Sequence, residues 1–370
     1  MLHEPDVDVT RNMTRRSPVN ATVRQVAARA GVSAMTVSRV INGRDGVGQK
    51  TRRKVEQAIL ELNYVPSRIA RGLISNKTDT IGLIVPDVAN PFFALLLRGA
   101  EMTARKAGYR LLVCNSEGDL RLEREYVNDL VSHRVEGLLI APASDRSKAS
   151  LVQLIRDGFP FVLVDRAIPG LDCDTVKGDS VVGARRLTEH LISIGHRRIA
   201  HITDSDDNVS TGRERLHGYM EALQAAGIPY SADLIFHATV DRIGGYRATQ
   251  QILALPDVPT AIFAVNNVSA VGAMQALRER GFSVPRDMGL VCFDDVEHLA
   301  VLSPFLTVMD QPAQTFGSLS AQLLLERISG RAGERSRHIE LQADLIVRES
   351  CCVRTGVPKR PTDRLVGVPR

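Results

Sequence analysis

The side chains best suited to holding a small polar ligand follow apolar runs or open a helix. They are Asp87, Asn90, Asp165, Arg166, Arg213, Arg215, Asn266, Asn267, Asp294 and Asp295. Carboxylates and amides form paired hydrogen bonds with hydroxyl groups, and the rings of Phe92 and Phe93 offer an apolar face for a sugar ring. The pattern favours a site for a sugar-like molecule at the ends of buried strands. Arg166 leaves two readings: a cation directed at an acidic or phosphorylated ligand, or an ion pair with a neighbouring carboxylate.

A second group of residues could read a DNA duplex. Thr22 and Gln25 have capping-box spacing ahead of apolar residues at helical spacing. Gly31 supplies a tight turn and Ser33 caps a second helix, which is the pattern of a helix-turn-helix. The second helix exposes Ala34, Met35, Thr36, Ser38 and Arg39. Slender side chains with one arginine suit a helix that enters the major groove.

A third helix is predicted from about residue 49 to residue 63, and its first turn carries four cations. Lys50, Arg52, Arg53 and Lys54 oppose the helix dipole there, so we expect them to meet phosphate groups. Residues 21–75 hold ten Lys and Arg against three Asp and Glu, whereas residues 76–350 carry a net charge of −6. A basic head on an acidic body indicates nucleic acid as the head's partner. The alternative is a solvated basic helical bundle.

The segment after Pro66 is expected to form a short helix only when docked, because so short a helix is unstable alone in water. Ala70 and Leu73 give it one apolar face, and Arg68 and Arg71 give it a basic one. A plain linker is the alternative. Residues 1–20 and 351–370 lack apolar periodicity, and we expect a disordered extension and a flexible tail.

Residues 77–350 alternate apolar runs with amphipathic stretches, which predicts strand–helix units and parallel sheets. The expected strands are 80–86, 110–115, 137–141, 159–164, 198–202, 234–236, 261–264 and 289–293. The expected helices are 92–106, 120–133, 183–194, 213–226, 245–255 and 269–280. Two groups of four units are too many for one small sheet, so we expect two similar α/β lobes with a ligand cleft between them.

The sequence does not favour catalysis. It contains no nucleophile elbow, Walker loop, zinc-protease motif or dinucleotide fingerprint, and no catalytic residue is assigned. The five cysteines lack metal-ligand spacing, so we expect free reduced thiols, no metal and no cofactor. There is no secretory signal and no apolar stretch of membrane-spanning length. We therefore expect a cytoplasmic, nucleoid-associated protein.

The run from Val26 to Asn42, V-A-x-x-A-G-V-S-x-x-T-V-S-R-V-I-N, resembles the DNA-binding headpiece of the LacI/GalR family of bacterial repressors. The motifs T-R-x-x-V from Thr51 and L-N-Y-x-P-S-R-x-A-R-x-L from Leu62 extend the likeness, which continues to about residue 350. The resemblance implies an all-α three-helix headpiece, followed by an α/β two-lobed, periplasmic-binding-protein-like (type I) domain with parallel sheets.

The domain limits follow from the same resemblance. We expect a helix-turn-helix domain at 21–66, a hinge helix or linker at 67–76, and a two-lobed effector-binding and dimerisation domain at 77–350. The first lobe takes about 77–180 and 312–338, and the second takes about 181–311 and 339–350. The chain then crosses between lobes near Ser180, Gln311 and His338.

The resemblance also implies residue roles. Positions matching the family's effector site are Phe92, Asp165, Arg215, Asn266 and Asp294, to which we add their neighbours Phe93 and Arg166. Expected DNA contacts are Arg39, Ala34 and Met35 on bases, Thr22, Ser33, Thr36, Ser38 and Asn42 on phosphates, and Arg71 and the wedge Leu73 in the hinge. Two positions depart from the family, which usually has Asp at Asn267 and Asn at Ser180. The loss of a carboxylate at Asn267 could alter a hydrogen bond that stabilises the lobe, or shift the ligand preference.

These features predict a ligand-responsive transcription factor, most simply a homodimeric repressor of sugar or carbohydrate genes on a near-palindromic operator. The expected partners are operator DNA, a small-molecule effector and a second copy of the chain, without a membrane. A sugar receptor or transport component would share only the two-lobed body and has no use for the basic headpiece. An activator, or a repressor whose co-ligand is another protein, remains open within the regulator class.

Overall fold

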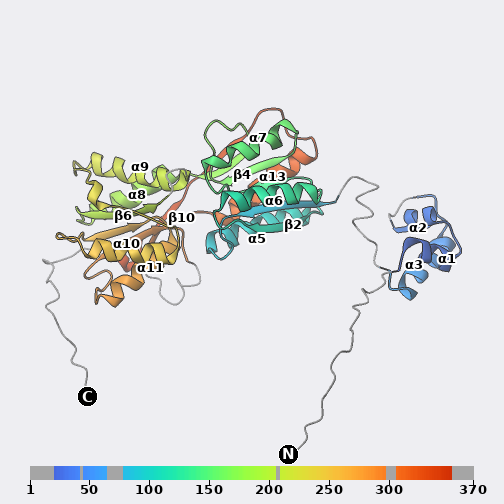
Figure 1. Ribbon diagram of the computed structural model, residues 1–370, viewed down its shortest axis with the longest axis horizontal. Helices are drawn as coiled ribbons and strands as arrows, with labels where there is room; N and C mark the ends of the chain where they lie inside the picture. Colours follow the sequence, from blue (N-terminus) through green and yellow to red (C-terminus); the bar gives the residue numbers. More distant parts are fainter. Residues whose placement is uncertain (1–20, 42–44, 65–77, 206–208, 297–305, 352–370) are drawn as a thin grey trace, which may run out of the picture. The chain divides into compact units, whose positions relative to one another are not determined.

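The computed structural model describes residues 21–41, 45–64, 78–205, 209–296 and 306–351. The chain divides into two compact units, Met1–Thr78 and Asp79–Arg370 (Figure 1). The expected terminal extension, the hinge at 67–76, and the tail beyond Cys351 lie outside the described residues. None of the helices within the described ranges is both long and apolar enough to cross a membrane.

The first unit contains α1 (Val23–Ala30), α2 (Ala34–Ile41) and α3 (Gln49–Glu61). The expected capping box forms: Gln25 N–H donates to Thr22 Oγ1 at 3.3 Å, and Thr22 N–H donates to Gln25 Oε1 at 2.7 Å. Gly31 ends α1 with a φ of 66°, a conformation that glycine adopts without a side-chain clash. Ser33 Oγ accepts from Thr36 N–H at 3.2 Å and so caps α2. The turn chemistry expected from the sequence is confirmed.

A small apolar core holds these three helices together. Its buried side chains are Val26, Ala27, Ala30, Val37, Val40, Val55, Ala58 and Tyr64. They recur every three or four residues along the helices, so each helix buries one face and leaves the other to solvent.

The second unit contains two lobes. In the N-lobe the strand order is β11-β5-β4-β3-β1-β2, and neighbouring strands are parallel. Its strands are β1 (Thr80–Val85), β2 (Arg110–Asn115), β3 (Leu138–Ile140), β4 (Phe161–Asp165), β5 (Thr175–Gly178) and β11 (His338–Leu341). Its helices are α5 (Pro91–Lys106), α6 (Leu120–Ser132), the 3-10 turn η1 (Asp145–Ser147), α7 (Lys148–Arg156) and α13 (Ala313–Ile328). Helices α5 and α13 bury one face of the sheet, and α6 and α7 bury the other.

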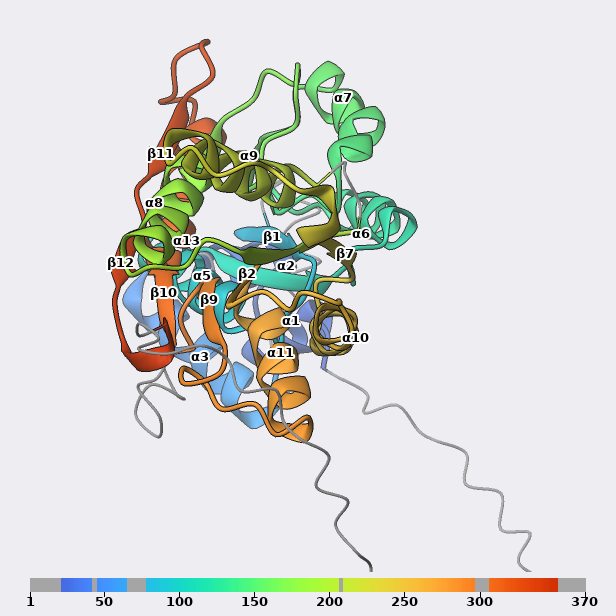
Figure 2. The same ribbon diagram turned by 90° about the vertical axis from the view of Figure 1, so that its left-hand side faces the viewer.

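The C-lobe repeats this plan with the strand order β12-β10-β9-β8-β6-β7. Its strands are β6 (Ile199–Asp204), β7 (Ile235–Ala238), β8 (Ala261–Ala264), β9 (Gly289–Phe293), β10 (Thr307–Asp310) and β12 (Asp344–Ile346), of which only β12 pairs antiparallel. Its helices are α8 (Ser180–Ser193), α9 (Ser210–Ala225), η2 (Ala232–Leu234), α10 (Arg242–Leu253), α11 (Asn267–Glu279) and η3 (Glu349–Cys351). Figure 2 shows α8 and α9 on one side of the sheet and α10 and α11 on the other.

The fold class expected from the sequence is confirmed: a three-helix headpiece and two α/β lobes with mostly parallel sheets. All eight expected strands and six expected helices form within a few residues of their expected limits. Strands β5, β10, β11 and β12 and helices α7 and α13 were not expected. The chain crosses between lobes at Asp179, between β10 and α13, and again after β11. The third crossing therefore follows Leu341 and not His338, because β11 still pairs with β5.

Candidate functional site

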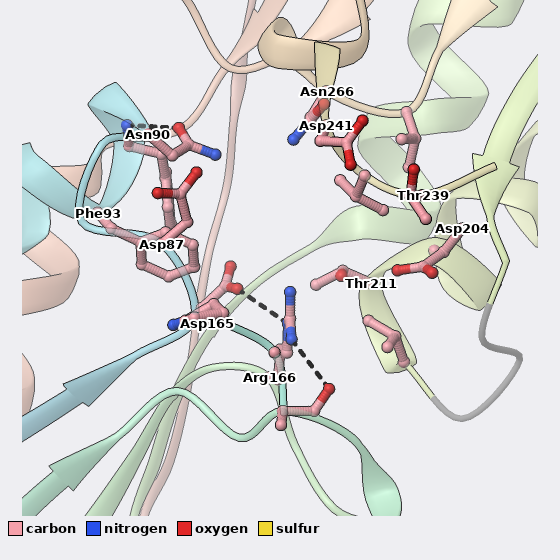
Figure 3. A pocket seen from close by; sticks show the side chains of 18 of the residues that line it. Asp87, Asn90, Phe93, Asp165, Arg166, Asp204, Thr211, Thr239, Asp241 and Asn266 are labelled. Carbon is pink, nitrogen blue, oxygen red and sulfur yellow. Dashed lines mark hydrogen bonds and ion pairs between the residues drawn. The ribbon is translucent and has the colours of Figure 1, made fainter. Parts of the chain in front are cut away.

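A cleft of about 580 Å³ opens where the strands of both sheets end (Figure 3). Its lining comes from the residues at or just after the carboxyl ends of strands in each lobe, for example Asp87 after β1 and Val265 after β8. This is the place where open parallel sheets bind ligands, and the volume suits a small molecule.

All seven residues proposed for the effector site line this cleft. They are Phe92, Phe93, Asp165, Arg166, Arg215, Asn266 and Asp294. The structure thus brings together side chains that lie as far as 202 residues apart in the sequence, from Phe92 to Asp294. Their contact with an effector stays a prediction.

On the N-lobe side, Asn90 sets the position of the two phenylalanines. Its Oδ1 accepts from Phe92 N–H at 3.0 Å, which caps α5 at the rim of the cleft. The Phe92 and Phe93 rings meet edge to face with centroids 5.1 Å apart, and Phe316 packs on Phe92 at 5.6 Å. Packing from behind therefore fixes an apolar surface at this wall.

Asp165 ends β4 in the left-handed region, with a φ of 69°, and its side chain is buried. Arg166 Nε lies 3.4 Å from Asp165 Oδ2, and the same guanidinium donates to the carbonyl oxygens of Pro142 and Ala143 at 2.9 and 3.3 Å. The ion pair with a neighbouring carboxylate therefore forms, and a contact between Arg166 and a ligand stays a prediction.

Arg215 is only 5% exposed and interacts electrostatically with both buried carboxylates of the cleft, Asp165 and Asp294. It donates to the Val265 carbonyl oxygen at 2.7 Å, and its guanidinium carbon lies 4.0 Å from the centre of the Phe293 ring. Its Nε has no hydrogen-bond partner among the described residues. A buried donor left open at a cleft is suited to a ligand oxygen.

Asp294 follows β9 with a φ of 65° and is held by Gln311, whose Nε2 donates to Asp294 Oδ1 at 2.7 Å. Burial raises the pKa of Asp165 to about 6, while the nearby arginines Arg166 and Arg215 oppose that rise. Burial likewise raises the pKa of Asp294, against the effect of Arg215. The arginines thus offset part of the cost of two desolvated carboxylates.

Asn266 caps α11 by accepting from Ser269 N–H at 2.9 Å. Asn267, where the resembled family has Asp, is fully buried and donates to the Asp295 carbonyl oxygen at 3.3 Å. Asp179 caps α8 at Val182 N–H, so Ser180 begins that helix at the first crossing between lobes. Arg213 does not line the cleft and pairs with Asp145 at 3.0 Å.

The lining residues of the C-lobe that were not expected from the sequence include Asp204, Thr211, Thr239 and Asp241. Strand β6 runs two residues past its expected end and finishes at Asp204, and β7 likewise runs on to Ala238. The rule that polar residues at strand ends line the site would have found Asp204 and the Thr239–Asp241 loop had these ends been placed correctly.

The DNA-contact candidates of the described headpiece lie on and before α2. Met35 is 68% exposed, Ala34 and Arg39 are exposed, and Thr36 and Ser38 are half-buried. The Ser33 and Thr36 hydroxyls are 2.9 Å apart, and Thr22 is exposed at the cap of α1. Asn42, Arg71 and Leu73 lie outside the described residues.

No disulfide joins any two of the cysteines of the described ranges, Cys114, Cys173, Cys292 and Cys351. No group of three His, Cys, Asp or Glu side chains within those ranges is placed to hold a metal ion.

Comparison with known proteins covers both units. Residues 78–349 match the family described as periplasmic binding proteins and sugar binding domain of LacI family, and residues 22–67 match bacterial regulatory proteins, lacI family. The transcriptional repressor PurR of Aliivibrio salmonicida is 37% identical over 331 residues, covering 89% of this chain and 98% of that protein. The ribose operon repressor of Escherichia coli is 36% identical over 330 residues, covering 89% and 99%.

Solved structures agree with these matches. The lac repressor dimer bound to operator and the anti-inducer ONPF aligns with a TM-score of 0.79 at 29% identity, covering 90% of this chain and all of that one. The complex of the transcriptional regulator CelR with cellobiose aligns with a TM-score of 0.67 at 34% identity and the same coverage. The chain therefore belongs to the LacI family of bacterial regulatory proteins, which are DNA-binding transcription regulators and not enzymes.

Proposed function

We propose that this regulator is a homodimeric repressor whose binding to a near-palindromic operator depends on a small sugar or sugar derivative held in the cleft. The observation behind the proposal is the convergence of seven sequence-separated side chains on one polar cleft in a chain that also has a helix-turn-helix. The operator-bound lac repressor dimer supports the proposed binding of DNA by a dimer, and the cellobiose complex of CelR supports the proposed sugar effector.

In this proposal α2 enters the major groove. Arg39 forms a bidentate contact with a guanine, and Ala34 and Met35 touch neighbouring base edges. The hydroxyls at the start of α1 and α2 and the cations of α3 meet phosphates, which orient the helix without reading sequence. Two copies place their headpieces on two half-sites related by a two-fold axis.

An effector acts by changing the angle between the lobes, which alters the spacing of the two hinge segments and therefore of the headpieces. Such a ligand shifts DNA occupancy only if it prefers one lobe arrangement by several kcal/mol. The assignments of Arg71 and Leu73 to the hinge, and of Asn42 to the phosphates, rest on the sequence and the family resemblance.

The test selects operators from random duplexes with the full chain and then measures affinity by fluorescence anisotropy across salt concentrations. Arg39→Ala should cost roughly 1–3 kcal/mol on the selected operator and flatten base preference at one position of each half-site. Arg53→Ala, which alters a cation proposed for phosphate, should weaken all sequences alike and reduce the salt dependence. If Arg39→Ala lost the same amount of affinity for the operator and for scrambled DNA, the proposed base contact would be refuted.

A further inference from the structure

Two ion pairs join the C-lobe to the N-lobe at the start of α9. Arg213 Nη2 lies 3.0 Å from Asp145 Oδ2, which belongs to η1 of the N-lobe. The next residue of α9 has the opposite charge: Glu214 Oε1 lies 3.1 Å from Lys177 Nζ on β5 of the N-lobe. Consecutive residues of one C-lobe helix therefore contact two separate elements of the other lobe.

The two N-lobe partners lie on either side of strand β4 in the sheet. Asp145 follows β3 and Lys177 belongs to β5, and β4 lies between β3 and β5 in the strand order. Strand β4 ends at Asp165, which lines the cleft. Burial raises the pKa of Asp165 most, and the negative charge of Glu214 adds to that rise. The ion pairs therefore reach the N-lobe beside the strand that carries its buried cleft carboxylate.

The segments that carry these ion pairs are anchored within their own lobes. Just before η1, Ala143 N–H donates to Glu123 Oε2 of α6 at 2.5 Å. In α9, Tyr219 Oη donates to the Ile199 carbonyl oxygen of β6 at 2.8 Å, and Gly218 lies against the backbone of α8. Because each segment is fixed to its own lobe, a change in the angle between the lobes must lengthen or break the contacts between them.

The ion pairs between the lobes are more exposed than a structural ion pair within a lobe. Inside the N-lobe, Asp174 pairs with two arginines and its side chain is fully buried, whereas the Arg213 side chain is 43% exposed. Lys177 Nζ also lies 3.1 Å from Glu340 Oε1 of its own lobe, so it keeps a partner when Glu214 withdraws. Exposed charges are solvated at little cost when they separate, so these contacts can open and re-form.

Ion pairs of this kind are weak, but they act on an equilibrium between states of similar free energy. A single exposed pair changes an equilibrium constant by roughly fivefold or less. A contact that exists in only one arrangement of the lobes shifts the populations of the two arrangements by its whole strength. Two such pairs on one helix are therefore sufficient to decide which arrangement is the more populated.

We propose that Arg213 and Glu214 are positioning residues, which hold the two lobes in the arrangement of this structure through their partners in η1 and β5. Neither side chain belongs to the described lining of the cleft, although Thr211 and Arg215 of the same helix do. The two residues therefore act on the cleft by setting the distance between its walls. The inference rests on the proposed function only where the arrangement of the lobes is taken to govern DNA binding.

The first experiment reverses the charges of the Arg213–Asp145 pair, singly and together, and follows amide hydrogen exchange of the full chain by mass spectrometry. Arg213→Glu and Asp145→Arg should each speed exchange by roughly fivefold in the segment of the other lobe that carries the partner, because the lobes separate more often. The double variant restores the pair with its charges exchanged, so both segments should return to the parent rate. Arg213→Lys keeps the charge and should stay close to the parent.

Glu214→Gln tests the second pair without leaving Lys177 unpaired, since Glu340 remains beside it. It should speed exchange in β5 and add to the effect of Arg213→Glu. The matched control is Arg121→Glu, which breaks an ion pair of 3.0 Å with Glu125 inside α6 and joins no lobes. The control should leave exchange in η1, β5 and α9 unchanged.

The second measurement is the affinity of the same variants for operators selected with the parent chain. Both single reversals of the Arg213–Asp145 pair should change this affinity in the same direction, by roughly threefold to fivefold, and the double variant should restore it. A mere loss of local stability would not be repaired by exchanging the charges, so this rescue separates a positioning role from a structural one.

Exchange that rises only in the lobe carrying the substitution overturns the proposal, as does a double variant that exchanges as fast as the single ones or a control with the same effect. Failure of the proposed function looks different. Rescued exchange with operator affinity unchanged in every variant would support the positioning role and show that DNA binding does not depend on the arrangement of the lobes. A parent chain that binds no duplex DNA at low salt would refute the proposed function, and the rescue of exchange would still decide the role of the ion pairs.

Discussion

In the N-lobe, β4 ends at Asp165 with a φ of 69°, and in the C-lobe the matching strand β9 is followed at once by Asp294 with a φ of 65°. The strands occupy the same place in two sheets of the same order. Non-glycine residues rarely adopt this conformation, and such strain gathers at functional sites. The repeated plan thus delivers one buried carboxylate from each lobe to the cleft, and Arg215 interacts electrostatically with both.

Around these two carboxylates the lobes differ. The N-lobe contributes aromatic rings from the first turn of α5 together with Asp87 and Glu117. The C-lobe contributes threonines and aspartates from the end of β6, the loop after β7 and the start of α9. The sheets fix where the site is, and the loops and helix starts fix what it binds. The stability of the two lobes should therefore fall alike when the close helix contact that both contain is disturbed. Changes to the buried titratable groups or to the cleft walls, which differ between the lobes, should have different effects.

The largest expected effect is on folding stability, at the close contact between two helices that each lobe contains. Gly317 of α13 lies against the Leu96 carbonyl oxygen of α5, and Gly218 of α9 lies against the Val181 carbonyl oxygen of α8, so a Cβ at either position would collide with backbone. Gly317→Ala and Gly218→Ala should each cost about 3 kcal/mol in urea unfolding, since overpacking outweighs the helix propensity that alanine gains.

Gly333→Ala is the control, because a Cβ there meets nothing within 4 Å and φ is not positive. It should be nearly neutral. If only one of the two helix glycines proved costly, the lobes would not share this close helix contact in solution.

The next prediction compares how one buried group in each lobe changes the folding stability with pH. His201 of the C-lobe is fully buried between Tyr219 and Phe263, its Nδ1 donates to the Phe263 carbonyl oxygen, and burial lowers its pKa to about 3. The unfolded chain takes up this proton near pH 6.5 and the folded chain does not, so His201 removes stability as pH falls below 6.5. Asp165 does the opposite: with a folded pKa of about 6, it adds stability as pH falls from 6 towards 4.

His201→Phe should therefore flatten the loss of stability on acidification, and Asp165→Asn should steepen it, each by up to about 1 kcal/mol per pH unit. Urea unfolding of both variants and the parent between pH 4.5 and 7 measures the slopes. Curves that run parallel to the parent would show that neither group keeps its shifted pKa.

The sequence predicted best those elements whose own residues carry the signal. Strands such as Ala261–Ala264 and Gly289–Phe293 are uninterrupted apolar runs, because both faces of their sheet are covered by helices. Strand β5 reads Thr-Val-Lys-Gly and β11 reads His-Ile-Glu-Leu, and both are too short and too polar to stand out in the sequence. They form because β5 pairs with β4 on one side and with β11 on the other. Helix α13 packs against both α5 and the N-lobe sheet, so it buries small polar residues such as Ser320 among its apolar ones, and a single apolar stripe does not mark it.

The site residues were likewise predictable where the signal was local in the sequence, and not where it depended on contacts with distant residues. The residues proposed from strand ends line the cleft because parallel strands bring their carboxyl ends together. Arg166 could not be resolved from sequence, because its partners include the carbonyl oxygens of Pro142 and Ala143, more than twenty residues away. Asp204 was missed because β6 continues through the polar residues Thr203 and Asp204, which the pairing with β7 stabilises.

The smallest expected effect concerns the aromatic rings of the N-lobe wall. Phe93→Leu keeps apolar volume in the N-lobe core but removes the ring face, so it should weaken the binding of a sugar in the cleft by roughly tenfold. Titration of the melting temperature of the full chain measures the affinity, and urea unfolding confirms that the variant folds. A Phe93→Leu variant that bound the sugar as tightly as the parent would mean that the Phe93 ring takes no part in recognition and that the lobes do not divide it between rings and polar groups.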